Sequence, residues 1–175
     1  MDRICVKAWW GDHRQEILLA FMVSLVAFGV MLTCPTIGID EEKSILAGEG
    51  YGPWIPQGRF GIQMFNELFT VNGRYVPFLW DFLAVCVWFF SGVTSAFTLL
   101  EEDGWKTGRF ELFIFLTYYT TLPFVVGEIL SFSMFNLQVS LGMASASLAF
   151  AFTARYLKYI EKTEMTKEEK HDEKR

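Results

Sequence analysis

The chain of 175 residues has a net charge of −5 and is 52% hydrophobic and 17% aromatic, with 18 Phe and 6 Trp. This apolar fraction exceeds what the core of an ordinary soluble domain needs. The acids gather in loops and near the C-terminal end, and no basic stripe suited to nucleic acid exists, which excludes a nucleic-acid-binding protein. The three cysteines, Cys5, Cys34 and Cys86, form no C-x-x-C pair, so neither a disulfide nor a metal site is indicated.

Four apolar runs are long enough to cross a bilayer, which takes roughly 20 helical residues. The first is longer than the apolar part of a cleavable signal peptide, roughly 7–15 residues, and no A-x-A site follows it. The third and fourth runs are together too long for one crossing, so we expect a tight turn between them at Ser133 to Asn136. We therefore expect an all-α, polytopic membrane protein with four transmembrane helices at about 17–36, 78–100, 112–134 and 137–157.

The distribution of Lys and Arg predicts the orientation of these spans. With both termini in the cytoplasm, 12 of the 15 basic residues lie inside and 3 outside, and the opposite orientation reverses these numbers. Cytoplasmic loops carry the excess of positive charge. The predicted organisation is a cytoplasmic N-terminal segment (1–16), a four-helix transmembrane domain (17–157) with an external loop (37–77), and a charged cytoplasmic tail (158–175) that is helical or disordered.

The external loop contains an amphipathic segment and an acidic cluster. Residues 59–71 place their apolar side chains on one side of a helical wheel, which predicts a helix lying in the membrane interface. Asp40, Glu41 and Glu42 follow the outer end of the first span within a few residues. They are compatible with a solvated turn or a helix N-terminus, and also with a functional site near the outer leaflet.

Two further acids lie inside predicted spans. Asp81 is near the outer end of the second span, and Glu128 is about 24 Å along the third, also toward the outer leaflet. Intramembrane acids are costly and by default suggest function. The alternative is that Asp81 and Glu128 have a structural role only and pair with Arg59, with Arg74 or with backbone groups.

These features resemble the N-terminal part of the bacterial Gtr-type glucosyltransferases, membrane enzymes of the GT-C class that modify O-antigen. The resemblance covers roughly residues 15–157, and in place of the family's Gly-Arg-Trp motif the chain has Gly58-Arg59-Phe60. The segments that carry it are Ile39 to Glu42, Tyr51 to Trp54, Gln57 to Phe60, Pro77-Phe78, Pro123 to Glu128, Leu130 to Phe132 and Ser140-Leu141.

The resemblance implies an inverting transfer of glucose from a polyprenyl-phosphate donor to a cell-surface polysaccharide, in the bacterial inner membrane. Asp40, or else Glu41, would be the catalytic base. The substrate-binding residues would be Glu42, Arg59, Arg74, Asp81 and Glu128, with an arginine on the lipid phosphate. No cofactor is expected. The carboxylates could hold a divalent metal ion, but the chemistry does not require one.

Members of that family are longer, so we expect a truncated gene product, one part of a split enzyme with a partner membrane subunit, or a minimal relative. The main alternative is a non-catalytic four-helix flippase or accessory subunit for lipid-linked sugars. A third is a transporter fragment whose intramembrane acids bind protons or ions, but that function favours acids near the membrane centre.

Overall fold

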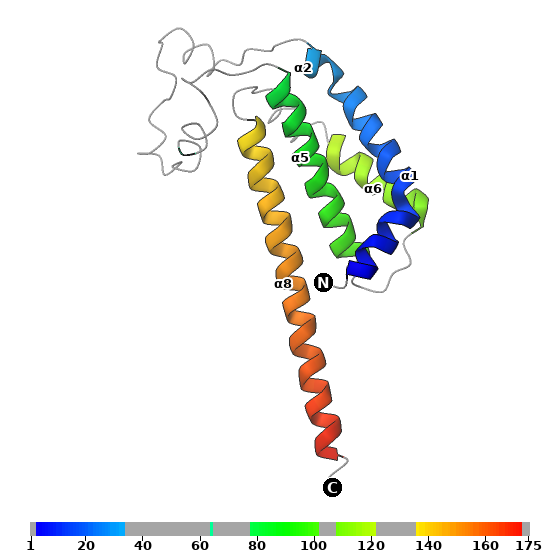
Figure 1. The fold of residues 1–175 in the computed structure, drawn as a ribbon, viewed down its shortest axis with the longest axis vertical. Helices are drawn as coiled ribbons and strands as arrows, with labels where there is room; N and C mark the ends of the chain where they lie inside the picture. The colour runs from blue at the N-terminus through cyan, green and yellow to red at the C-terminus, as the bar shows by residue number, and fades with distance from the viewer. Residues whose placement is uncertain (1–2, 34–63, 65–77, 102–107, 122–135, 173–175) are drawn as a thin grey trace.

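The computed structural model describes residues 3–33, 64, 78–101, 108–121 and 136–172, and these contain helices and no strands (Figure 1). The expected all-α class is confirmed for this part of the chain. The elements are α1 (Arg3–Ala27), α2 (Gly29–Thr33), α5 (Leu79–Ala96), the π-helix η2 (Phe97–Glu101), α6 (Arg109–Thr121) and α8 (Asn136–Asp172).

The helices α1 and α2 form one rod despite their separate labels. The Phe28 N–H donates to the Ser24 carbonyl at 3.0 Å, and the Leu32 N–H donates to the Phe28 carbonyl at 2.9 Å. Both bonds have the i→i−4 spacing of an α-helix. The rod begins at Arg3, well before the span expected at 17–36, and Figure 1 shows its first turns at an angle to the rest.

Two helices are long and apolar enough to cross a membrane, at Leu79–Leu99 and Leu137–Met165. They match the spans expected at 78–100 and 137–157. Of the expected third span, the structure describes the part within α6, and 122–134 lies outside the described residues. The predicted interfacial helix at 59–71 also lies outside them, apart from Met64.

Successive long helices run in alternating directions. In Figure 1, α1 and α6 run toward one end of the molecule, while α5 and α8 run toward the other. The most extensive packing is between α5 and α8, followed by α1 with α6. The C-terminal half of α8 extends alone beyond the other helices, so the charged tail continues the helix to Asp172 (Figure 1).

The buried side chains form two apolar clusters. One cluster, near the start of α1, is built from Trp9, Ile17, Ala20, Phe89, Ala96, Leu112 and Leu116. The other, toward the starts of α5 and α8, is built from Phe28, Ala84, Val85, Trp88 and Leu137. Hydroxyl groups join the helices between these clusters: Ser24 Oγ lies 2.7 Å from Thr120 Oγ1, and Ser91 Oγ lies 2.9 Å from Tyr119 Oη.

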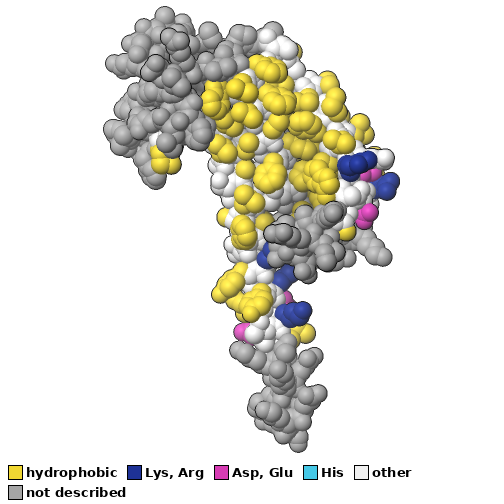
Figure 2. Space-filling view, viewed as in Figure 1, with side chains coloured by type: hydrophobic (Ala, Val, Ile, Leu, Met, Phe, Trp, Pro, Cys, Tyr) yellow, Lys and Arg dark blue, Asp and Glu magenta, His cyan; other side chains and the backbone are white. Residues whose placement is uncertain are grey.

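The face of the bundle shown in Figure 2 is largely apolar as well. Large side chains turned outward include Leu18 at 53% exposure, Val26 at 77% and Phe152 at 68%. Contiguous apolar surface of this kind indicates contact with lipid or with another protein. Together with the two long apolar helices, it fits a membrane protein.

Candidate functional site

Asp81 is the one predicted site residue that the described part of the chain contains. It lies in the first turn of α5 and is 2% exposed. Ala84 and Val85, one turn further along the same side, are 0% and 1% exposed and pack with Phe28 and Leu137. A carboxylate in such an environment is a costly feature, which makes Asp81 a candidate site residue.

The start of α5 explains how a carboxylate is tolerated there. Phe78 is the N-cap and makes no side-chain hydrogen bond to the helix, so the first turn lacks the usual capping oxygen. Its φ of 64° lies in the left-handed region, which is unusual for a bulky residue. Asp81 is therefore the negative group that meets the positive end of the α5 dipole.

The polar side chains of α5 continue from Asp81 along the face that meets α8. Asp81, Trp88 and Ser95 are seven residues apart, and so are Ser140 and Ser147 on α8, a spacing that keeps residues on one face. The Ser95 hydroxyl donates to Ser147 Oγ at 3.1 Å. The two helices run in the same direction (Figure 1). Seven residues before the contact between Ser95 and Ser147, and therefore two turns closer to Asp81, Trp88 of α5 and Ser140 of α8 lie at the same level.

Two buried polar groups on this face have no hydrogen-bond partner. They are Trp88 Nε1, in a side chain 4% exposed, and Ser140 Oγ, in a side chain 0% exposed. Leaving such a group unsatisfied costs about 1–3 kcal/mol. Together with Asp81 they form what we call the α5/α8 polar face, a candidate surface for hydrogen bonding to a bound molecule.

The remaining predicted site residues fall outside the described residues. These are Asp40, Glu41, Glu42, Arg59, Arg74 and Glu128. The segment that carries the first five joins the end of α2 to the start of α5. It therefore leaves and rejoins the described bundle at the end where Asp81 lies.

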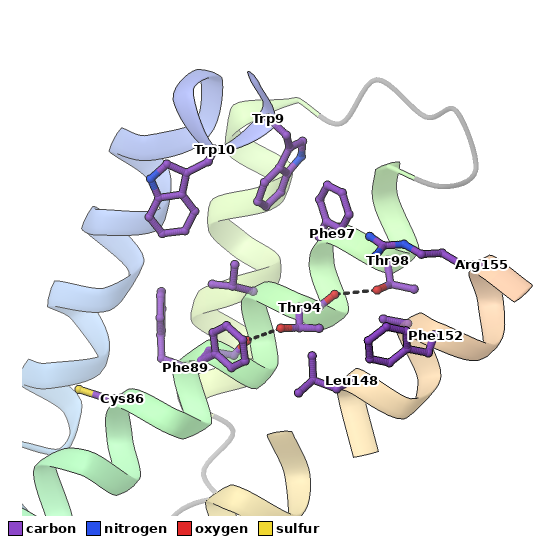
Figure 3. Close-up of a pocket in the computed structure, with 13 residues that line it drawn as sticks. Trp9, Trp10, Cys86, Phe89, Thr94, Phe97, Thr98, Leu148, Phe152 and Arg155 are labelled. Atoms are coloured by element: carbon purple, nitrogen blue, oxygen red, sulfur yellow. Dashed lines mark hydrogen bonds between the residues drawn. The ribbon is translucent and has the colours of Figure 1, made fainter. Parts of the chain in front are cut away.

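Sequence reasoning missed Trp88 and Ser140. Trp88 lies in no motif, and Ser140 belongs to a segment that carries the family resemblance but is not among the predicted site residues. The seven-residue spacing identifies the pair only once α5 and α8 are known to be neighbours. It also missed a cavity of about 330 Å³ at the opposite end of α5, between α1, α5 and α8 (Figure 3).

The apolar helices of the described residues fit a membrane protein. The family model that matches this chain is described as glucosyl transferase GtrII and covers residues 29–165, which is most of its length. The chain therefore belongs to the GtrII glucosyltransferase family, which confirms the Gtr-type resemblance. Neither a curated protein nor a solved structure matches it.

Proposed function

We propose that the chain is a glucosyltransferase of the bacterial inner membrane, or a subunit of one, that moves glucose from a polyprenyl-phosphate donor to a surface polysaccharide such as O-antigen. The match to the GtrII family over residues 29–165 carries this proposal. The buried carboxylate of Asp81 supports it, since it lies at the end of the bundle where the acidic loop leaves and rejoins.

The proposed topology has four crossings with both termini in the cytoplasm. The alternating directions of α1, α5, α6 and α8 support it, because each crossing reverses the chain (Figure 1). The excess of Lys and Arg on the side of the termini supports the orientation. In this topology Asp81 and the acidic loop face the periplasm.

The proposed reaction is a single displacement at the anomeric carbon of glucose. Asp40 takes the proton of an acceptor hydroxyl, and the acceptor oxygen attacks the anomeric carbon. The bond from that carbon to the phosphate oxygen breaks with inversion, and polyprenyl phosphate leaves. Glu41 is the second candidate base, and Arg59 or Arg74 stabilises the phosphate that leaves.

Within this scheme, Asp81 and the α5/α8 polar face bind the sugar. A carboxylate accepts hydrogen bonds from sugar hydroxyls, the Trp88 Nε1–H donates, and the Ser140 hydroxyl does both. Glu42 and Glu128 are the other acids proposed to bind substrate.

The experiment is transfer of labelled glucose from polyprenyl phosphate glucose in membranes that contain this chain alone. We expect transfer to a polysaccharide acceptor and its loss in Asp40→Asn. The matched control is Asp103→Asn, which removes the same charge from the loop proposed to face the cytoplasm and leaves transfer unchanged. Unchanged transfer in Asp40→Asn would show that another group is the base.

A second outcome separates the enzyme from an accessory subunit. If membranes with this chain alone transfer no glucose but gain transfer when a partner membrane protein is added, the chain is a subunit. If it instead moves lipid-linked glucose across the bilayer without transfer, the flippase alternative holds.

A further inference from the structure

The cavity at the opposite end of α5 from Asp81 has the form of a site for one lipid chain. It measures about 330 Å³, within the range of ligand pockets. Its walls are almost entirely aromatic and aliphatic, contributed by α1, α5 and α8 (Figure 3). The lining residues used below are Trp9, Trp10, Phe97, Ala151, Phe152 and Arg155.

The threonines in its wall present no free hydroxyl hydrogen. The Thr94 hydroxyl donates to the Phe90 carbonyl at 2.9 Å, and the Thr98 hydroxyl donates to the Thr94 carbonyl at 2.8 Å (Figure 3). Both hydrogen bonds stay within α5 and its continuation. The α5 wall is therefore suited to a hydrocarbon chain rather than to a sugar.

The length of the cavity matches one leaflet. Along α5 and the start of η2 its lining runs from Cys86 to Thr98, which at the α-helical rise of 1.5 Å per residue is about 18 Å. Half of a bilayer's hydrocarbon thickness is about 15 Å. One acyl chain of a phospholipid spans this distance.

One charged side chain lies at one end of this apolar cavity. Arg155 is the one charged residue among the described residues that line the cavity. Its guanidinium carbon lies 5.5 Å from the centre of the Phe97 ring (Figure 3). A guanidinium binds phosphate oxygens through its N–H groups. The cation lies beside this ring at the mouth of the cavity.

The basic side chains of α8 extend the cavity in the direction of a headgroup. Lys158 and Lys162 follow Arg155 at helical spacing, and with Ala151 and Phe152 all five fall within an arc of about 120° on the helix. The acids Glu161 and Glu164 fall outside that arc. The face of α8 that is apolar at the cavity is therefore basic immediately beyond it.

The tryptophans place this mouth at the membrane surface. Trp9 is 6% exposed and packs on Phe97 at 5.2 Å between ring centres, and Trp10 next to it is 46% exposed. Tryptophan is enriched at the level of the headgroups. In the proposed topology this is the cytoplasmic side, where anionic lipids attract Lys and Arg near the surface.

From this arrangement we propose that the cavity binds an anionic phospholipid of the cytoplasmic leaflet, with one acyl chain along α5 and the phosphate on Arg155. The proposal goes beyond glucosyl transfer, since the site lies at the opposite end from Asp81. It rests on the proposed topology and does not require that the chain be catalytically active.

The test measures contact between brominated lipids and the tryptophans at the mouth. The full chain is reconstituted in phosphatidylcholine vesicles with increasing mole fractions of phosphatidylglycerol brominated on its acyl chains. Bromine quenches tryptophan fluorescence on contact. We expect a saturable component of quenching at low mole fraction, absent when brominated phosphatidylcholine is used instead, and reduced when Trp9 and Trp10 are replaced by Phe.

Two pairs of variants assign this component to the cavity. Arg155→Gln raises its midpoint about tenfold, the effect of losing one charge-assisted hydrogen bond. Arg109→Gln, which removes the same charge from an arginine 68% exposed outside the cavity, leaves the midpoint unchanged. Ala151→Leu narrows the cavity and weakens the component, whereas Ala149→Leu on the outward face of α8 does not.

Circular dichroism and size-exclusion chromatography of each variant confirm that it is folded. Equal midpoints for Arg155→Gln and Arg109→Gln would overturn the proposal. Equal quenching by the two brominated lipids would overturn it as well. Displacement of the brominated phosphatidylglycerol by polyprenyl phosphate at an equal mole fraction would assign the cavity to the donor lipid instead.

Discussion

The contact between Gly92 and Tyr119 leaves no room for a side chain at position 92. A Cβ on Gly92 would lie 2.9 Å from Tyr119 Cδ1 and 3.3 Å from Cε1. The ring cannot move away freely, because its hydroxyl is hydrogen-bonded to Ser91 and its faces contact Trp88 and Phe115. We expect Gly92→Ala to cost about 1–3 kcal/mol of stability, as overpacking does.

The measurement is the unfolding midpoint of the purified protein in detergent micelles. Gly142→Ala is the matched control, because a Cβ there meets nothing within 4 Å. In that exposed helical position alanine stabilises by up to ~1 kcal/mol through its higher helix propensity. Equal shifts for the two variants would show that Tyr119 yields without cost.

Asp81 in α5 and Glu111 in α6 are each the third residue of their helix. A comparison of variants at the two positions therefore distinguishes an effect on helix stability from an effect on substrate binding. The Glu111 carboxylate accepts a hydrogen bond from the Gly108 N–H at 3.1 Å and caps α6. Asp81 has the same relation to the dipole of α5 but is buried at the candidate site.

We expect Asp81→Asn to lower glucosyl transfer about tenfold or more, the effect of losing a charge-assisted hydrogen bond to the sugar. Glu111→Gln should lower the unfolding midpoint without lowering transfer. Transfer rates and midpoints are measured on the same preparations. If Asp81→Asn changed only the midpoint, its role would be structural.

At the scale of single residues, the sequence alone singles out part of the candidate site. Asp81 could be predicted because a carboxylate in an apolar run is conspicuous without any knowledge of the fold. Trp88 and Ser140 could not, because their significance depends on the register between α5 and α8, which are separated by more than thirty residues of sequence. The same holds for Arg155, which lies beside Phe97 only after the helices have packed.

At the scale of elements, a buried pair of hydroxyl groups lies between α1 and α6. Ser24 and Thr120 are 0% and 1% exposed, and their oxygens lie 2.7 Å apart. Hydrogen bonds between membrane helices contribute about 0.6 kcal/mol on average and at most about 1.7. We expect a coupling of this size in a double-mutant cycle of Ser24→Ala and Thr120→Val, measured from unfolding midpoints.

A cycle of Ser24→Ala with Ser145→Ala is the control. Ser145 is exposed and bonds to the Leu141 carbonyl of its own helix at 2.8 Å, so the coupling should be zero. Zero coupling in both cycles would mean that apolar packing alone joins α1 to α6.

The helices illustrate what hydropathy predicts and what it does not. It predicted an apolar helix at 78–100, where the structure has α5 with η2, because an apolar run must lie in lipid or in a core. It did not predict that the first helix begins at Arg3 or that α8 continues to Asp172. The start at Arg3 was missed because helix ends depend on backbone hydrogen bonds and capping rather than on hydropathy. The continuation of α8 was missed because a segment of mixed charge is hydrated equally well as a helix or as a coil.

For the whole molecule, the proposed topology predicts opposite accessibility for the external loop and the tail. Replacing Cys5, Cys34 and Cys86 gives a cysteine-free chain, to which one cysteine is added at Ser44 or at Glu161. In intact spheroplasts, a maleimide that cannot cross the membrane should label Ser44→Cys and not Glu161→Cys. After permeabilisation it should label both, since Glu161 is exposed on α8.

The physical reason for this orientation is the uneven distribution of basic residues, since 12 of the 15 lie on the side of the termini. In the inverted arrangement these 12 residues would have to cross the membrane. The cysteine-free chain is the control for background labelling. Labelling of Glu161→Cys in intact spheroplasts would reverse the orientation. It would move Asp81 to the cytoplasm and Arg155 to the periplasm, and with them both the proposed glucosyl transfer site and the proposed lipid site.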